Sequence, residues 1–209
     1  MAEWTTISAL ATAGGTLVLA GATFSSVRSA NRAARTAERT LLAGLRPLLV
    51  PSRLEDPIQK VHFVDRKFLV VSGGGAAVEA VDDAAIYMAI SVRNAGTGIA
   101  LLHGWSFHPG RYRDDPAAPE DFFRLTRDIY IPAGDVGYWQ GTFRDPAAAA
   151  YAEAREAIAA GTEVTIDILY GDLEGGQRVI TRFVLMARGD GSWGSVVSRY
   201  WNVDGADPR

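Results

Sequence analysis

The sequence predicts a mainly β protein in which a long N-terminal helix precedes an antiparallel β-sandwich. Three observations support this prediction: an uncharged run near the N-terminus, apolar residues that alternate with a period of two beyond residue 46, and glycine-bearing turns between the alternating runs. A chain of 209 residues is long enough for one domain of ordinary size plus an extension. We therefore assign residues 1–45 to an N-terminal helical segment and residues 46–209 to the sandwich domain.

Residues 4–27 form an uncharged run of 24 residues, and Arg28 follows at once. Because a membrane-spanning helix needs about 20 residues, the run is long enough to span a membrane once. Its Ser, Thr and Gly residues make it only moderately apolar, so a helix that packs against the rest of the chain stays an alternative. The small residues Ala20-Gly21-Ala22 also resemble a signal-peptide cleavage site, but no Lys or Arg precedes the run, which disfavours a signal peptide.

Basic residues follow the uncharged run on its C-terminal side, at Arg28, Arg32, Arg35 and Arg39. Because positive charge gathers on the cytoplasmic side of membrane helices, we expect a single-pass cell-membrane protein whose C-terminal domain lies in the cytoplasm. The arginines lie along one side of an amphipathic helix at 28–45, where we expect them to contact anionic lipid head groups. Another stripe of this helix is mostly alanine, which permits self-association, and Gly44 and Pro47 end the helix.

Alternating apolar residues predict about eight to ten short strands after the helix. In one run the residues on one face are Ile86, Met88, Ile90 and Val92. In the next run they are Ile99, Leu101, His103, Trp105 and Phe107. Later runs lie at 164–170, 179–185 and 197–203, and weaker candidates lie at 47–52, 60–64, 67–72 and 76–81. Because short turns separate most runs, antiparallel pairing is favoured over a parallel sheet.

One further helix is predicted at 146–160, within the β-rich half of the chain. Asp145 suits its N-cap, Pro146 suits its first position, and Gly161 suits its C-terminal end. The apolar face of this alanine-rich helix is thin. We therefore expect it to lie on the surface of the sandwich or to connect the two sheets.

Two segments carry a resemblance to a known family: ISVRNAGTGIALL at Ile90–Leu102 and IPAGDVGYWQGTF at Ile131–Phe143. Asn94, Gly96 and Gly134 suit tight turns with positive φ between strands. The segments resemble bacterial immunoglobulin-like domains of the cell-adhesion-related type. The resemblance implies an immunoglobulin-like sandwich that binds or spaces other molecules and does not catalyse a reaction. Residues 109–128 and the helix at 146–160 depart from that pattern.

The composition excludes several classes of functional site. The chain has no cysteine, which excludes disulfides, thiolate metal sites and iron–sulfur clusters. A formal net charge of −3 gives no reason to expect nucleic acid as a partner. His103 and His108 point to opposite faces of one predicted strand, and the glycines at 73–75 are not followed by the Lys of a phosphate-binding loop. We therefore predict no catalytic residue, no metal site and no cofactor.

Adjacent aromatic residues carry the strongest functional signal. Trp105, Phe107 and Trp201 are expected in the core. In Tyr138-Trp139 and Tyr200-Trp201, both members of a pair cannot face inward within one strand. The candidate recognition surface therefore comprises Tyr138, Trp139 and Tyr200.

Together these features predict a membrane-anchored, non-catalytic interaction or scaffold module that binds a protein partner or associates with itself. One alternative is a soluble or exported binding protein whose N-terminal segment is a packing helix or a signal. The other alternative is an enzyme whose site is assembled from loops.

Overall fold

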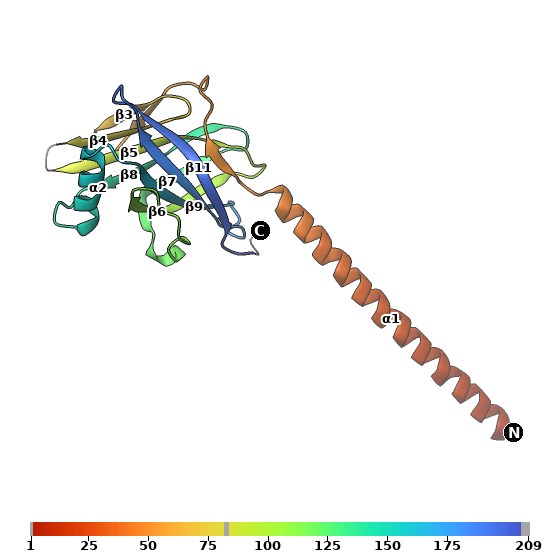
Figure 1. Ribbon diagram of the computed structural model, residues 1–209. Coiled ribbons are helices and arrows are strands. Elements are labelled where there is room, and N and C mark those ends of the chain that lie inside the picture. The colour runs from red at the N-terminus through yellow and green to blue at the C-terminus, as the bar shows by residue number, and fades with distance from the viewer. Residues whose placement is uncertain (1, 82–83, 206–209) are drawn as a thin grey trace. The chain divides into compact units, whose positions relative to one another are not determined.

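The computed structural model describes residues 2–81 and 84–205 (Figure 1). The chain divides into an N-terminal unit that ends at Ala43 and a C-terminal unit that begins at Gly44. The N-terminal unit consists of α1, a single helix of 43 residues at Ala2–Gly44. The two predicted helical segments, 4–27 and 28–45, thus form one uninterrupted helix, and the predicted end at Gly44 is confirmed.

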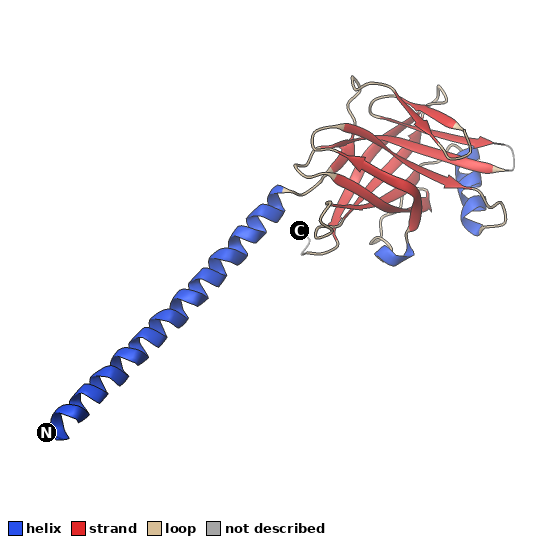
Figure 2. Cartoon of the chain, turned by 180° about the vertical axis from the view of Figure 1, so that it is seen from behind, coloured by secondary structure: helices blue, strands red, loops and turns tan. Residues whose placement is uncertain are grey.

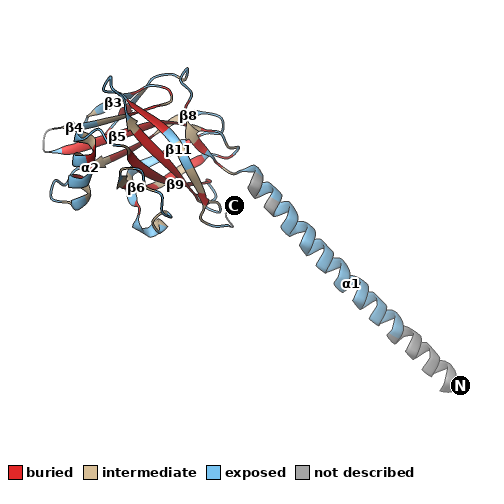
Figure 3. Cartoon of the chain, in the orientation of Figure 1, coloured by how far each residue is buried: buried red, intermediate tan, exposed pale blue. Residues whose placement is uncertain are grey.

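The side chains of α1 from Gly14 to Glu38 are exposed, and they include the apolar residues Leu17 and Phe24 (Figure 3). No helix in the described part of the chain combines the length and the apolar character that a membrane crossing requires. Membrane attachment through residues 4–27, with the C-terminal unit in the cytoplasm, stays a prediction.

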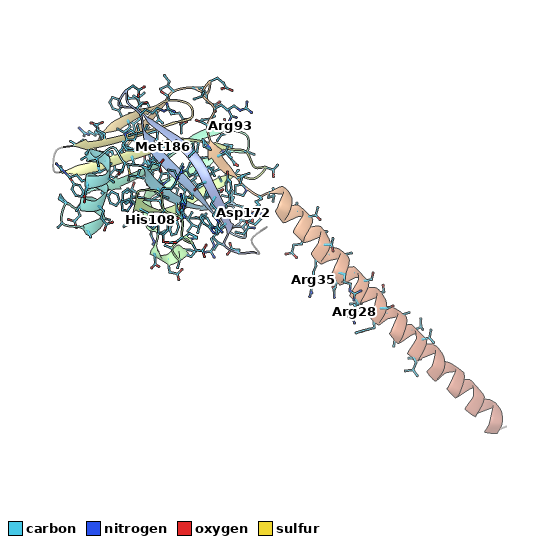
Figure 4. The ribbon with its side chains drawn as sticks, viewed as in Figure 1. Arg28, Arg35, Arg93, His108, Asp172 and Met186 are labelled. Atoms are coloured by element: carbon cyan, nitrogen blue, oxygen red, sulfur yellow. The ribbon has the colours of Figure 1, made fainter. Side chains whose placement is uncertain are left out.

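Three of the four predicted lipid-contacting arginines are exposed: Arg28, Arg32 and Arg35. Arg28 and Arg35 are two helical turns apart, so they project from the same side of α1 (Figure 4). The side chain of Arg39 lies outside the described residues. Contact of this basic stripe with lipid head groups stays a prediction.

The C-terminal unit is built on antiparallel strands, which confirms the prediction of a mainly β protein. The strands are β1 (Leu49–Pro51), β2 (Gln59–His62), β3 (Phe68–Val71), β4 (Gly75–Val81), β5 (Ala85–Asn94), β6 (Ala100–Pro109), β7 (Phe123–Ile131), β8 (Val136–Phe143), β9 (Val164–Gly171), β10 (Val179–Ala187) and β11 (Trp193–Asn202). The four weak strand candidates between 47 and 81 all correspond to observed strands. Strand β7 was not predicted, because most of its residues are polar or exposed.

Hydrogen-bonded pairing joins nine of the described strands in one sheet, whereas the sequence predicts two packed sheets. The order is β1-β5-β4-β11-β10-β9-β6-β7. Strands β1 and β4 pair with successive parts of one edge of β5, and β8 pairs with the opposite edge. Strands β2 and β3 form a separate two-stranded hairpin. The large sheet curls around its own core, so that the inner face of every strand turns toward one apolar interior.

Aromatic side chains fill the inner core. The rings of Trp105 and Trp139 meet edge to face with centroids 5.3 Å apart, and Phe143 meets Trp105 in the same way at 5.1 Å. Buried isoleucine, valine and leucine side chains from β5, β9 and β10 surround these rings. Edge-to-face packing of this kind adds to the stabilisation that comes from burying apolar area.

Helix α2 (Ala149–Ala159) packs directly on the inner core. Its residues Tyr151, Ala154 and Ala157 are buried and belong to the same cluster as the tryptophans. The opposite side of the helix, which includes Ala152, Glu153 and Glu156, is exposed, so α2 lies at the surface with one face on the core, in agreement with the expected surface position. The helix also begins three residues later than predicted, since Asp145 accepts a hydrogen bond from the Ala147 N–H in a turn that precedes it.

Two β-bulges change which residues face the core. In β6 the pairing passes from Leu102 to Gly104, so His103 has no partner in the ladder. In β11 the pairing with β10 passes from Arg199 to Val197, so Ser198 has none. Because a bulge adds one residue to one strand, it inverts the alternation beyond it.

The predicted face of the 99–107 run is correct only beyond the first bulge. Trp105 and Phe107 are in the inner core, but so are Ala100 and Leu102 in place of Ile99 and Leu101. The predicted face of the 197–203 run is divided in the same way. Val197 packs against the inner core, whereas Trp201 and Val203 belong to a cluster on the outer face.

Asn94 organises the turn that follows β5. Its side-chain amide donates to the carbonyl oxygens of Gly98 (2.7 Å) and Ile131 (3.0 Å), while its Oδ1 accepts from the Leu48 and Gly96 N–H groups. A positive φ was predicted for Asn94, Gly96 and Gly134. Of these three residues, only Gly134 has one, at 75°. Gly96 is required for another reason, because a Cβ there would overlap the carbonyl oxygen of Arg46.

Two segments cover parts of the outer face of the curled sheet (Figure 2). The first is the β2–β3 hairpin, residues 59–71, which we call the hairpin cover. It packs on Ala85, Tyr87 and Ala89 of β5. The second is residues 109–122, which we call the loop cover and which includes a short 3-10 helix at Pro119–Asp121. It buries Phe122 against outer-face residues of β9, β10 and β11.

Candidate functional site

The three residues of the predicted recognition surface occupy different environments. Trp139 is fully buried and belongs to the inner core, whereas Tyr138 and Tyr200 are half-buried. Tyr138 lies on β8 and Tyr200 on β11, and β5 and β4 separate these two strands in the sheet. Only the two tyrosines therefore offer surface to a partner, and they do so from separate strands. The predicted core positions of Trp105 and Phe107 are confirmed, whereas Trp201 is buried on the outer face of the sheet.

Tyr138 takes part in closing a seam between β7 and β8, two described strands that do not pair with each other through their backbones. The Arg127 guanidinium donates to the Tyr138 hydroxyl (3.0 Å), to Gln140 Oε1 (2.9 Å) and to the carbonyl oxygen of His62 (2.5 Å). One side chain from β7 thus bridges β8 and the hairpin cover. A cavity of about 160 Å³ remains in the seam, lined in part by Trp105 and Phe123.

A larger opening lies where β4 and β11 separate. This groove of about 610 Å³ runs between β3, β4 and the β10–β11 turn at 188–193. Strand β4 pairs with β11 only at Gly75 and Ala76, although its pairing with β5 continues to Val81. In the part of the chain that the structure describes, no strand pairs with the second edge of Ala77–Val81. The groove therefore lies along an open strand edge.

The β10–β11 turn forms one wall of the groove and is held by its own hydrogen bonds. The carboxylate of Asp190 accepts from the Ser192 N–H (2.9 Å) and hydroxyl (2.7 Å), and these bonds lower the pKa of Asp190. Gly191 adopts a positive φ of 82° within the turn. Both hydrogen bonds lie within the turn.

Strand β3 forms the opposite wall. Leu69 and Val71 point inward under the hairpin cover, whereas Phe68 and Val70 are 44% and 56% exposed and line the groove. The ammonium of Lys60 lies 3.8 Å from the centroid of the Phe68 ring. The wall thus combines exposed apolar surface with a cation at its margin.

A salt bridge joins the residue before β3 to β4. Lys67 Nζ lies 2.5 Å from Glu79 Oε1, and both side chains are partly exposed. Exposed pairs of this kind contribute little to stability, about 0–1 kcal/mol. Their position matters more, because this pair of opposite charges lies at one opening of the groove.

The glycines at 73–75 connect β3 to β4 at the closed end of the groove. A Cβ at Gly73 would overlap the carbonyl oxygen of Arg53, and the Gly74 N–H donates to Ser52 Oγ at 2.9 Å. The tight turn fixes the spacing of β3 and β4. Asp82 and Asp83, which follow β4 in the sequence, lie outside the described residues.

The titratable side chains of the described residues do not gather at the groove as a metal cluster. Among residues 2–81 and 84–205, no group of three His, Asp or Glu side chains could hold a metal ion. His103 and His108 do not line the groove, and burial lowers the pKa of each imidazole. The groove offers main-chain donors and acceptors along β4, flanked by apolar side chains.

The sequence analysis missed this groove, although one signal for it was present. In the run 68–71, FLVV, all four residues are apolar, so a strand there must present apolar side chains on both faces. Such a strand is either covered on both sides or exposes one apolar face. The structure shows the second arrangement.

Comparisons with known proteins return no match for this chain: no protein-family model, no curated protein and no solved structure matches it. The resemblance of Ile90–Leu102 and Ile131–Phe143 to immunoglobulin-like domains therefore stays a prediction.

Proposed function

We propose that the C-terminal unit is an interaction module that binds an extended segment of a partner protein by strand addition along β4. The observation that carries this proposal is the open edge of Ala77–Val81, of which Ala77, Val78 and Glu79 line a groove of about 610 Å³. Unpaired N–H and C=O groups on a strand edge favour an added strand, since each bond to the added backbone satisfies a group of both chains.

The size of the groove supports an extended segment as the occupant. An added strand rises about 3.3 Å per residue, so five paired residues need about 17 Å of edge. Alternate side chains of such a strand would point toward Phe68 and Val70 on one side and toward solvent on the other. The chemistry thus favours a partner segment with alternating apolar residues.

A folded globular partner fits the groove less well. A flat interface between folded proteins needs a broad complementary surface, with about 800 Å² buried on each side. Here Phe68 and Val70 of β3 lie along one wall of a channel whose other wall is the β10–β11 turn. A single extended segment can enter this channel and make both main-chain and side-chain contacts.

A selection from displayed peptides of about ten residues, which span about 33 Å when extended, tests the proposal. We expect selected peptides to slow the hydrogen exchange of the β4 amides at Ala77–Val81. The Val70→Asp variant should weaken their binding at least tenfold, because it places a charge on the apolar wall.

Val64→Asp is the matched control. Val64 lies in the turn of the same hairpin and is 65% exposed, but it does not line the groove. Its substitution should change the affinity less than twofold. Equal weakening by both variants, or peptides that leave β4 exchange unchanged, would contradict strand addition at this groove. A selection that enriches no peptide would contradict it as well.

Membrane attachment through residues 4–27 stays part of the proposal as a prediction from the sequence. Flotation of the full-length chain with anionic liposomes tests it. We expect the wild-type chain to float, and the basic stripe should contribute, so that replacing Arg28, Arg32 and Arg35 by Gln reduces the floated fraction. A wild-type chain that stays at the bottom of the gradient would contradict the prediction.

A further inference from the structure

We propose that the outer face of β10 and β11 carries a binding site for a phosphate group, in a pocket of about 220 Å³ beneath the loop cover. The pocket is lined by Arg111, Tyr112, Arg113, Arg182, Ser198 and Arg199. Four of these six residues are arginines and none is acidic, in a chain whose formal net charge is −3. The site is separate from the groove along β4.

The bulge at Ser198 places Arg199 in this pocket. Without the bulge, Arg199 would follow Val197 on the face that packs against the inner core. The additional residue turns Arg199 to the outer face, directly opposite Arg182 on β10. Bulges are frequent next to binding sites because they re-aim side chains in this way.

Arg182 forms the fixed wall of the pocket. It is almost fully buried, and its Nε and Nη2 donate to the two carboxylate oxygens of Asp167 at 2.7 and 2.6 Å. Its Nη1 donates to the carbonyl oxygen of Asp114 at 2.7 Å and, at 3.3 Å, to that of Tyr112. The charge of Arg182 is therefore balanced, and its role is to hold the loop cover in place.

Unlike Arg182, Arg199 lacks a hydrogen-bond partner among the described residues for one of its buried donors. Its Nε is buried and has no hydrogen-bond partner in the described part of the chain. Its nearest acid is Asp115, at 3.9 Å, and the Asp115 side chain is 84% exposed. The guanidinium stacks over the Trp201 ring at 4.9 Å, which orients it. Since a buried donor without a partner is unfavourable, an acceptor that reaches this donor would be stabilising.

The loop cover contributes two more arginines. Arg111 lies 3.4 Å from Glu163, and both side chains are well exposed. No hydrogen bond or ion pair joins the Arg113 side chain to another residue between 84 and 205 or in 2–81. The donors that remain available to a ligand are thus those of Arg113 and Arg199, which meet at the pocket from two elements.

A phosphate group matches these donors better than a carboxylate does. A phosphate monoester carries a charge of about −1.5 to −2 at pH 7 and three acceptor oxygens, so it can engage two guanidinium groups together. A carboxylate has two oxygens, and one bidentate arginine engages both of them. The aromatic wall of Tyr112 leaves room for the group that bears the phosphate.

Titration of the full-length chain, followed by NMR, tests the site with inorganic phosphate, phosphoserine and acetate. We expect phosphate and phosphoserine to shift the resonances of Arg113, Ser198 and Arg199, and acetate to bind more weakly. Arg199→Gln should weaken phosphate binding about tenfold, as the loss of charge-assisted hydrogen bonds predicts. Asp115→Asn should strengthen binding, because Asp115 competes for Arg199.

Arg124→Gln is the control, since Arg124 is an exposed arginine on β7 that does not line the pocket. If Arg124→Gln weakens binding as much as Arg199→Gln, the attraction is general and the site is refuted. Acetate that binds as tightly as phosphate also refutes it. Vesicles with phosphatidate distinguish the sources: phosphoserine binding assigns a dissolved phosphate monoester, whereas binding only to the vesicles assigns a lipid head group.

Discussion

The hairpin cover and the loop cover lie on the outer face of the same sheet, but different forces hold them. The hairpin cover buries Val61, Phe63, Leu69 and Val71 against β5, in a contact made almost wholly of apolar side chains. The loop cover buries little beyond Phe122. Its backbone is tied to the sheet by hydrogen bonds from Arg182 and by Thr165, which accepts from the Tyr112 N–H (3.1 Å) and donates to the carbonyl oxygen of Gly110 (2.8 Å).

This difference explains why each cover borders a different kind of opening. Apolar packing is non-directional and leaves main-chain groups of the neighbouring strands unused, so the hairpin cover borders a groove with an open strand edge. Hydrogen bonds from a guanidinium are directional and concentrate positive charge, so the loop cover borders a pocket rich in arginine. The two candidate sites thus follow from how their covers are attached.

Arg182→Met should have the largest effect on stability. It leaves the fully buried carboxylate of Asp167 without its partner, and breaking a buried ion pair in this way costs about 3–5 kcal/mol. Denaturant unfolding of the two proteins measures the change. The loop cover should also become sensitive to proteolysis, because the carbonyl oxygens of Tyr112 and Asp114 lose their donor.

The double variant Arg182→Met/Asp167→Leu separates the two roles of this pair. Removing both charges should recover most of the free energy of unfolding, since an apolar pair often replaces a buried ion pair without loss. The loop cover should stay loose, because its backbone donor is still absent. A double variant that is as unstable as Arg182→Met would contradict the view that an unpaired carboxylate causes the loss.

Leu69→Ala should have the next largest effect, because the hairpin cover depends on apolar burial. Leu69 is 4% exposed, and Leu→Ala substitutions in cores cost about 2–5 kcal/mol. Its neighbour Val70 is 56% exposed, so Val70→Ala should change the free energy of unfolding by less than about 0.5 kcal/mol. Denaturant unfolding of both variants measures the contrast. Equal effects would show that the hairpin is not held by its buried face.

The strands that alternate regularly could be predicted from the sequence. Ile86, Met88, Ile90 and Val92 face the inner core as predicted, and so do the inward residues of β9. These strands are paired on both sides and have no bulge in their inward run, so a period of two survives along their length. Their partners, and the curling of one sheet where two were expected, depend on contacts between distant residues that periodicity does not encode.

The bulges, and the sites that depend on them, could not be predicted. His103 and Ser198 are ordinary strand residues, and the apolar residues on both sides of each bulge still alternate. An alternation that continues unbroken through the bulge would place Arg199 and Trp201 on the wrong face. The arginine pocket likewise joins residues 111–113 to residues 182 and 199, and no local pattern links them.

Acid should weaken the hairpin cover by a smaller amount, through Asp65 in the turn between β2 and β3. Burial would raise the pKa of this carboxyl, but hydrogen bonds from Tyr87 (2.5 Å), from the backbone and from Arg144 outweigh burial and lower the pKa below 3.8. A carboxyl whose pKa is lowered by folding stabilises the folded state fully above its unfolded pKa. That stabilisation is lost as the pH falls through the lowered pKa of the folded state.

Asp65→Asn should therefore cost less than about 1 kcal/mol at pH 7, since the carboxylate is partly exposed, and the cost should shrink below pH 4. Denaturant unfolding of both proteins at pH 7 and pH 3 measures this narrowing. The loop cover provides the contrast. Its attachment depends on hydrogen bonds from Arg182 and Thr165 and not on Asp65, so proteolysis at 109–122 should not follow the Asp65 titration. A loop cover that loosens in step with the hairpin would show that the two attachments are coupled, because the sheet between them would be transmitting the change.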